Sequence, residues 1–377
     1  MKILHTIQGL SASSGGPSTC SRDLMEGLWK LNAGAELVTV KSEDNLGAGR
    51  PWLIELTNDY RTPLAISQNL KCFLNESDYD IYHANALWMY QCHITAKVAR
   101  QKGRPYIISP HGMLYPTALK IKRWKKWPML KLWFNKDIHS ASCLHATCRE
   151  EMEHCRTFGY KGPIAVIPNP VVFPEGVELC KEKPALKSIG FLGRLHPIKK
   201  VENLLRGAAI AISKGCHPFT IEIMGKGSEE YEQFLRNEVE CLSLKEVVHF
   251  VGFVNGKEKY DRLSKLHALM VPSEQENFGM IVPEALICGT PVYASLGTPW
   301  QELSDEACGW WRDNNPETIA EIITEIVSLS NEEIIQMGTR GRALIERKYE
   351  QLHVASMMKQ LYEWLLNGGD KPEFVYE

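Results

Sequence analysis

Short apolar runs rich in β-branched residues alternate with longer amphipathic runs along most of this chain. In the first half the apolar runs are KILHTI, AELVTV, YDIYHA and PYIISPHG, with helical patterns over about residues 18–30 and through ITAKVAR. Strands separated by helices indicate βαβ units, whose strands pair in parallel. The alternation therefore predicts an α/β protein with doubly wound parallel sheets.

The alternation stops once and then restarts. Residues 172–187 are rich in Pro, Glu and Lys without periodicity, and SIGFLGRL opens a second series. A chain of 377 residues also exceeds the roughly 250 to 300 residues at which one hydrophobic core stops growing. We expect two Rossmann-like domains facing across a cleft, over residues 1–171 and 188–350, joined by a linker at 172–187. Residues 351–377 are expected to form a helix that packs back on the N-terminal domain.

Composition narrows the class of protein. An apolar fraction of 44% and a charged fraction of 23% are ordinary globular values, and a net charge of −2 argues against a nucleic-acid binder. Eleven cysteines are scattered without a C-x-x-C pair or a zinc ligand set, and the chain opens directly into a strand-like run. We expect reduced cysteines, a cytoplasmic location and, without a long apolar run, at most peripheral membrane contact.

Two loops at predicted strand ends in the first half carry candidate residues. Gly15 and Gly16 precede a helix that we expect Ser18 to cap. Small residues there let backbone N–H groups approach an anion, although an isolated Gly-Gly pair is more often a plain turn. His111 ends the strand in SPHGML, where a structural role is the commoner one for a single histidine.

The strand SIGFLG in the second half ends in another candidate loop. Arg194 and Lys199 lie five residues apart across the turn that follows it. Both cationic groups could bind one diphosphate, and a solvated basic turn is the alternative. The nearby EIMGKGSEE has Glu230 where a dinucleotide fingerprint needs its third glycine, which disfavours an NAD enzyme.

The segment SEQENFGMIVPEAL holds two carboxylates, Glu276 and Glu284, eight residues apart. HALMVPS before it is predicted to be a strand, and Pro283 fits only the first turn of the helix after it. Glu276 then lies in the loop and Glu284 about one turn into the helix. The backbone amides of Gly279, Met280 and Ile281 lie between them at a helix start, which suits a phosphate.

Together these motifs resemble the retaining glycosyltransferases of family GT4, which have the GT-B fold. GRLHPIKK, VVHFVGFV, PSEQENFGMIVPEALICGTPV and the Gly-Gly loop occur in the family's order and rough spacing over nearly the whole chain. The resemblance implies transfer of a sugar with retention from a UDP- or GDP-linked donor to a hydroxyl of a saccharide acceptor. It further implies a lipid-linked acceptor and a role in bacterial O-antigen, capsule or lipopolysaccharide biosynthesis.

The resemblance also assigns roles to residues at the centre of the donor site. It implies that Arg194 and Lys199 bind the donor diphosphate, that Glu276 contacts the donor sugar and that Glu284 holds the ribose hydroxyls. His111 would lie beside the transferred sugar. Catalytic roles are therefore expected for Glu276, His111, Arg194 and Lys199.

Further donor contacts follow from the same family pattern. Gly16, with Gly15 beside it, would approach the diphosphate or the acceptor. The remaining positions implied to contact the donor are Gly252, Phe253, Val254, Phe278, Gly279, Met280 and Ile281. Two departures stand out: Lys200 replaces a usual glycine, and GTPWQEL replaces the commoner Gly-Gly-x-x-Glu loop beside the donor sugar.

We expect no metal and no cofactor. Fixed cations and helix starts can stabilise the charge that grows on a leaving nucleoside diphosphate. Asp78 and Asp80 form a D-x-D, which we interpret as a strand entry instead of a metal site. For retention the resemblance implies front-face attack with the leaving phosphate as base. A double displacement through Glu276 is the rival mechanism.

Residues 118–136 combine cations with tryptophans. The segment ALKIKRWKKWPMLKLWFNK contains Trp124, Trp127 and Trp133 among seven Lys or Arg residues, with no acid before Asp137. One interpretation is an interfacial segment that touches anionic lipid. The other is a solvated helix face whose tryptophans pack inward.

Two other functions compete with the transferase. A sugar-nucleotide epimerase of the same fold would share the phosphate grip, but it needs acid–base carboxylates and no acceptor site. A non-catalytic two-domain sugar-binding protein is normally secreted. The basic segment at 118–136 favours the transferase.

Overall fold

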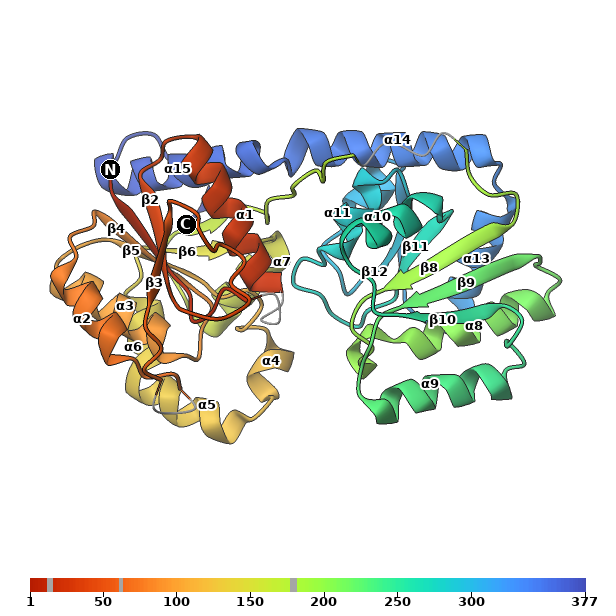
Figure 1. The fold of residues 1–377 in the computed structure, drawn as a ribbon, viewed down its shortest axis with the longest axis horizontal. Coiled ribbons are helices and arrows are strands. Elements are labelled where there is room, and N and C mark those ends of the chain that lie inside the picture. The colour runs from red at the N-terminus through yellow and green to blue at the C-terminus, as the bar shows by residue number, and fades with distance from the viewer. Residues whose placement is uncertain (12–15, 61–63, 177–181) are drawn as a thin grey trace. The chain divides into compact units, whose positions relative to one another are not determined.

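The structure is a computed structural model that describes residues 1–11, 16–60, 64–176 and 182–377. The chain divides into two compact units. An N-terminal unit comprises Met1–Val172 and Tyr349–Glu377, and a C-terminal unit comprises Phe173–Lys348. Each unit is built on its own sheet (Figure 1).

The N-terminal unit contains an eight-stranded sheet in the order β14-β7-β6-β5-β4-β1-β2-β3. All neighbouring strands pair in parallel except β14, which is antiparallel to β7. The strands are β1 (Ile3–Thr6), β2 (Ala35–Val40), β3 (Leu53–Leu56), β4 (Ile81–Asn85), β5 (Tyr106–Ser109), β6 (Cys143–Ala146), β7 (Ile164–Val166) and β14 (Val375–Tyr376). The central strands are buried on both faces, as parallel strands covered by helices should be.

Helices cover this sheet and connect its strands. They are α1 (Gly16–Lys30), α2 (Gln68–Glu76), α3 (Tyr90–Gln101), α4 (Pro116–Lys120), α5 (Arg123–Met129), the π-helix η2 (Leu130–Phe134), α6 (Asn135–His139), α7 (Arg149–Phe158) and α15 (Gln351–Asn367). The expected cap at Ser18 was wrong, because α1 begins two residues earlier. The hydroxyl of Ser18 instead donates to the carbonyl of Gly9 at 3.0 Å.

The last helix of the chain belongs to the N-terminal unit. α15 (blue in Figure 1) packs against α1 (red), where a Cβ added at Gly27 would lie 2.8 Å from the Cβ of Ala355. Gln351 accepts a hydrogen bond from Lys30 and donates one to the carbonyl of Asp23, both at 2.8 Å. The expected return of the C-terminal helices to the N-terminal domain is confirmed.

A buried chain of hydrogen bonds joins α15 to the sheet. His145 contacts the carbonyl of Ile167 at 2.8 Å and Ser109 at 2.7 Å, and His83 contacts Ser109 at 2.6 Å. Tyr362 of α15 then bridges His83 and His5, at 2.8 and 2.7 Å. The chain of hydrogen bonds therefore runs, in order, through Ile167, His145, Ser109, His83, Tyr362 and His5.

One set of neutral tautomers satisfies that chain. His145 must donate through Nε2 to a carbonyl, so its Nδ1 accepts from the Ser109 hydroxyl, and each later link then has one donor and one acceptor. Burial, and repulsion between the two rings when both are protonated, lower the pKa of His5 beside His145 to about 3, and burial lowers the pKa of His145 to about 4. These imidazoles therefore stay neutral at physiological pH.

The C-terminal unit contains an all-parallel six-stranded sheet in the order β10-β9-β8-β11-β12-β13. Its strands are β8 (Lys187–Leu192), β9 (Phe219–Met224), β10 (Val248–Gly252), β11 (Ala268–Val271), β12 (Val292–Ser295) and β13 (Gly309–Arg312). Its helices are η3 (Pro197–Lys199), α8 (Val201–Ser213), α9 (Glu229–Cys241), α10 (Gly256–Lys265), α11 (Ile281–Ile287), α12 (Glu302–Asp305), α13 (Pro316–Ser328) and α14 (Asn331–Lys348).

The strand order places a topological switch at β8. The chain moves outward from β8 to β9 and β10, then returns to the other side of β8 with β11. At such a switch the loops after neighbouring strands diverge and leave a crevice, where ligands bind in open α/β sheets. The expected fold class of two doubly wound parallel-sheet domains is confirmed.

Candidate functional site

A pocket of about 350 Å³ lies at the carboxyl ends of β8, β9 and β10 in the C-terminal unit. The loops after these strands and the start of α11 form its walls. The lining residues are Leu192, Gly193, Arg194, Met224, Gly225, Lys226, Phe253, Val254, Lys259, Ile281 and Glu284. Five of them, Arg194, Phe253, Val254, Ile281 and Glu284, are residues that the sequence predicted.

Glycines allow the backbone to close tightly beneath this pocket. Gly225 has φ +157°, and a Cβ there would lie 1.9 Å from the carbonyl oxygen of Gly193. Its N–H donates to the carbonyl of Gly252 at 2.7 Å, and Gly193 donates to Met224 at 3.0 Å. No other residue fits at Gly225 without displacing the backbone. Gly252 itself has φ +88° and ends β10.

Glu284 meets a cation that the sequence reasoning missed. Lys259 of α10 contacts its carboxylate at 2.8 Å, and about a fifth of each side chain is exposed. Burial has the largest single effect and lowers the pKa of Lys259, but the charge of Glu284, together with Tyr260 and the hydrogen bonds to both residues, raises the pKa above its usual value. Lys259 lies five residues after Val254, so the signal available in the sequence was a lysine in the first turns of the helix after the VGFV motif.

Glu276 and Lys199 meet each other. Their side chains form a hydrogen-bonded ion pair, and Ser273 also donates to Glu276 at 2.8 Å. Only 12% of the Glu276 side chain and 19% of the Lys199 side chain are exposed. The neighbouring pair, Lys200 and Glu274, is 3.1 Å apart and more open to solvent. The loops after β8 and β11 are therefore joined by two parallel ion pairs.

Gly297 and Trp300 hold in place the loop that carries Glu276. Glu276 N donates to the carbonyl of Gly297 at 2.9 Å, and a Cβ at Gly297 would lie 2.1 Å from the carbonyl oxygen of Glu274. Phe278 is buried against Trp300, whose indole donates to the Phe278 carbonyl. The departure GTPWQEL thus supplies the glycine and the tryptophan that support this loop.

The loop then turns into α11. Gly279 has φ +74°, and α11 begins at Ile281 with Met280 as its first flanking residue. Ile281 and Glu284 reach the pocket beside Arg194. Glu276 lies one loop away, where it holds Lys199. The structure therefore separates the two glutamates as expected, one in the loop and one in the helix.

His111 lies in the N-terminal unit at the carboxyl end of β5, with φ +51°. Its Nε2 is buried and has no hydrogen-bond partner within the described residues. Burial, and repulsion from His145 when both rings are protonated, lower the pKa of His111 to about 3, so the ring stays neutral at physiological pH. It lines a small cavity with Asn85, His145 and Asn169.

The Gly-Gly loop is described only in part. Gly15 lies outside the described residues. Gly16 is exposed at the start of α1, and a Cβ added there would meet nothing within 4 Å. Packing within the N-terminal unit therefore does not require glycine at that position.

A second pocket, which sequence reasoning missed, lies in the N-terminal unit. It has a volume of about 470 Å³ at the carboxyl ends of β1, β2 and β4. Its walls include Lys41, Ser42, Tyr60 and Trp88. The Ser42 hydroxyl and the Trp88 indole N–H are buried, and neither has a partner among the described residues. Aromatic faces and unused polar groups in one hollow suit a polar, ring-shaped ligand.

Asp78 and Asp80 face a single arginine. Arg104 approaches Asp78 at 3.2 Å and Asp80 at 3.7 Å, and Asp80 also accepts from the N–H of Lys2 at 2.8 Å. Asp78 and Asp80 precede β4 and lie at the amino ends of the strands, opposite the pocket beside Trp88 in the same unit. Within the described parts of the chain, no three His, Cys, Asp or Glu residues are grouped so as to hold a metal.

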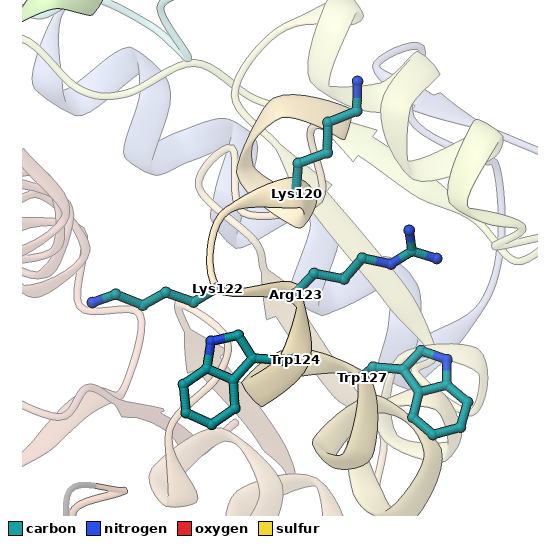
Figure 2. Close-up of a pocket in the computed structure, with 5 residues that line it drawn as sticks. All are labelled: Lys120, Lys122, Arg123, Trp124 and Trp127. Carbon is teal, nitrogen blue, oxygen red and sulfur yellow. The ribbon is translucent and has the colours of Figure 1, made fainter.

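The tryptophans of residues 118–136 point in different directions. Trp133 stacks on His93 with ring centroids 5.0 Å apart. Trp124 and Trp127 are 74% and 58% exposed, and Figure 2 shows their indoles on α5 beside the cationic side chains of Lys122 and Arg123. The inward-packed interpretation therefore holds for one indole of the three. Across the residues described, no helix is long and apolar enough to cross a bilayer.

Comparison with known proteins identifies the two halves of the chain. Residues 14–172 match the family profile described as Glycosyltransferase Family 4, and residues 181–343 match the one described as Glycosyl transferases group 1. Together the two matches cover most of the sequence.

Individual relatives share shorter segments. An uncharacterised glycosyltransferase, MJ1607 of Methanocaldococcus jannaschii, is 32% identical over 38% of this chain and 36% of its own length. The O-antigen biosynthesis glycosyltransferase WclY of Escherichia coli is 26% identical over 39% of each chain. The chain thus spans less than half the length of these curated relatives.

The fold matches solved structures over nearly its whole length. A crystal structure of Anabaena Alr3699/HepE in complex with UDP and glucose superposes with a TM-score of 0.73. The match covers 96% of this chain and 99% of that one, at 18% sequence identity.

Proposed function

Since the chain belongs to the glycosyltransferases of family 4, with the GT-B fold, we propose that it transfers a sugar with retention from a nucleotide-sugar donor to a saccharide hydroxyl. The strand-end pocket of the C-terminal unit carries this proposal. This pocket contains the cation of Arg194 and the Glu284–Lys259 ion pair. Its floor is a close packing of two backbone segments that only a glycine at position 225 permits. A nucleoside diphosphate offers the matching groups: phosphate oxygens, ribose hydroxyls and a flat base.

Each part of the donor has a candidate partner. The exposed guanidinium of Arg194 suits the diphosphate, because its planar fork can bind two phosphate oxygens at once. Glu284 suits the ribose, since a carboxylate accepts hydrogen bonds from two hydroxyls. Phe253, which is 66% exposed, offers a flat apolar surface to the base. The donor is UDP- or GDP-linked in this proposal.

The proposed reaction proceeds on one face of the donor sugar. The acceptor oxygen forms a bond to the anomeric carbon while the bond from that carbon to the diphosphate oxygen breaks. The acceptor proton passes to the leaving diphosphate, so no protein base is required. Glu276 supports this pathway, because Lys199 and Ser273 already engage its carboxylate and make it a weaker nucleophile for a double displacement.

We assign the acceptor to the N-terminal unit. The pocket beside Trp88 supports this assignment, since its unused hydroxyl and indole donors suit a saccharide. The name of the Escherichia coli relative supports a role in surface-polysaccharide assembly. In such pathways the growing saccharide is carried on a lipid, so we propose a lipid-linked acceptor and peripheral contact with the cytoplasmic face of the membrane.

The test is a panel of UDP- and GDP-sugars incubated with the purified protein, with nucleotide release as the signal. One donor should be consumed faster than the others, and an added saccharide acceptor should raise its turnover. The anomeric configuration of the product, read by NMR coupling constants, should match that of the donor. Conversion of the donor to a different nucleotide sugar without acceptor would instead indicate an epimerase.

Removing divalent metal should leave this turnover unchanged. Arg194 and Lys199 supply fixed positive charge near the leaving diphosphate in our proposal, so EDTA is expected to change the rate by less than about twofold. Adding Mg²⁺ or Mn²⁺ back is the control. Loss of activity in EDTA with recovery in metal would contradict the metal-free mechanism.

Replacing Glu284 should weaken nucleotide binding. Glu284→Gln removes a charged acceptor from the ribose, and hydrogen bonds to charged groups contribute about 1.5–3 kcal/mol, or roughly 10- to 100-fold in Kd. Titration calorimetry with UDP and GDP measures the change. Glu222→Gln is the matched control. Glu222 pairs at 3.0 Å with Arg262, which lies on α10, as does Lys259, the partner of Glu284. Equal losses in both variants would place Glu284 outside the ribose site.

A further inference from the structure

Residues 120–132 form an exposed surface that the donor and acceptor sites do not use. We define the basic-tryptophan surface as the five residues that line one shallow hollow, Lys120, Lys122, Arg123, Trp124 and Trp127 (Figure 2), together with the exposed Leu132 that follows them in the sequence. Trp124, Trp127 and Leu132 are 74%, 58% and 72% exposed. Large apolar side chains at this exposure are costly in water, and their gathering on one short stretch indicates a binding surface.

The charge on this surface has one sign. Residues 118–136 contain seven cations and no acid. The next acid, Asp137, is fully buried and pairs with Arg100 and His93, so it does not offset the surface charge. Among the described residues, no ion pair involves Lys120, Lys122 or Arg123. An anionic partner complements this surface.

The surface is anchored to the core of its unit. Leu119, Met129, Leu130 and Trp133 pack on the hydrophobic core, and Phe134 is fully buried in it. The five-residue π-helix Leu130–Phe134 follows α5 directly and changes the helical register. The segment thus contains both apolar residues that pack on the core and apolar residues that face solvent. The buried ones fix the backbone from which the exposed ones project.

The surface also adjoins the proposed acceptor pocket. The ammonium of Lys126 lies 5.2 Å above the ring of Trp88, and the rings of Trp88 and Phe134 are 5.6 Å apart. Trp88 forms a wall of the pocket in the N-terminal unit. Lys126 lies between Trp124 and Trp127 in the sequence, so a partner bound to the basic-tryptophan surface lies close to the proposed acceptor pocket.

We propose that the basic-tryptophan surface docks on an anionic lipid bilayer, with its indoles at the headgroup level and its cations among the lipid phosphates. Tryptophan prefers this interface because its ring is apolar and its N–H is polar, and clustered Lys and Arg are attracted to anionic leaflets. The role of docking, to bring a lipid-linked acceptor to the pocket beside Trp88, rests on the proposed function. The docking itself does not.

Vesicle co-flotation of the full chain tests the docking. Vesicles of phosphatidylcholine with phosphatidylglycerol should carry the protein, and vesicles of phosphatidylcholine alone should carry much less. Each cation removed should weaken binding about fivefold, so Lys122→Gln with Arg123→Gln should weaken it roughly 25-fold. Trp124→Ser with Trp127→Ser should also release the protein. Trp29→Ser, at a position that is 47% exposed on α1, is the matched control and should bind normally.

Three results would overturn the proposal. They are equal flotation on both vesicle types, flotation unaffected by the paired substitutions, and a concentration-dependent dimer that the Trp124 and Trp127 substitutions abolish while vesicles carry no protein. The last would identify a second copy as the occupant. Donor turnover with a water-soluble acceptor separates this proposal from the proposed function. Variants of the basic-tryptophan surface should keep that turnover. If the unmodified chain binds vesicles but transfers no sugar, the proposed function fails and the docking proposal stands.

Discussion

Lys199→Met is expected to lower kcat/KM about 100- to 1,000-fold, because it removes a fixed charge that we propose stabilises the leaving diphosphate. The same change leaves Glu276, whose side chain is only 12% exposed, without its cationic partner, while the hydroxyl of Ser273 still donates to its carboxylate. The loss should therefore appear in kcat as well as in KM. Steady-state rates with the preferred donor measure it, and circular dichroism checks that the variant folds.

The neighbouring ion pair provides a matched control. Lys200→Met removes a cation one position away, whose partner Glu274 is 60% exposed. We expect less than about a threefold change there, since exposed pairs contribute little. Comparable losses at Lys199 and Lys200 would indicate a general electrostatic effect of the basic turn, the alternative that the sequence left open.

A double-mutant cycle tests whether Lys199 and Glu276 act as one unit. Glu276→Ala alone should lower kcat/KM about 100-fold or more. If the two side chains act through each other, the double variant should lose much less than the product of the single losses. Full activity in Glu276→Ala would remove this residue from the catalytic machinery.

The second large effect is acid destabilisation of the N-terminal unit. The pKa of His5 and that of His111 are lowered to about 3, and the pKa of His145 to about 4, in each case first by burial. Unfolding returns each pKa to about 6.5, so below that pH the unfolded chain binds more protons than the folded one. Stability is therefore complete above about pH 6.5 and is lost as the pH falls toward 4.

The expected slope is large. Each of these histidines removes about 1.4 kcal/mol of unfolding free energy per pH unit within that window. Urea unfolding at about pH 7.5 and about pH 5 measures the difference. His145→Gln keeps a donor for the Ile167 carbonyl but cannot be protonated, so the slope should decrease by about one proton. His353→Gln, at an exposed position on α15, is the matched histidine-to-glutamine control.

The β-α alternation made most of the fold predictable, because parallel strands buried on both faces read as short apolar runs. KILHTI, YDIYHA and SIGFLG became β1, β4 and β8, and the helix expected over about residues 18–30 is α1. β14 could not be predicted in this way. It is two residues long and is paired with β7 through a contact between residues more than 200 positions apart.

The candidate site was partly predictable for a related reason. Arg194 lies just after β8, and Ile281 and Glu284 lie in the first turn of the helix that follows the loop after β11. The carboxyl ends of parallel strands, and the loops and helix starts that follow them, meet at one edge of the sheet. Lys259 was missed because a single lysine on the helix after β10 is a weak signal, and its partner Glu284 lies 25 residues further along the chain. The pocket beside Trp88 was missed because its walls come from separate strands and helices of the N-terminal unit, none of them conspicuous alone.

The sequence by itself determined the two parallel-sheet domains, the family and the loops that carry the donor-site residues, because periodicity and strand-end motifs are local. Only the tertiary structure decided the partners of those residues. It joined Glu276 to Lys199 and Glu284 to Lys259, and it turned Trp133 inward while Trp124 and Trp127 faced solvent. Pairing and exposure depend on which distant segments meet in space, and a linear pattern of residue types does not specify that.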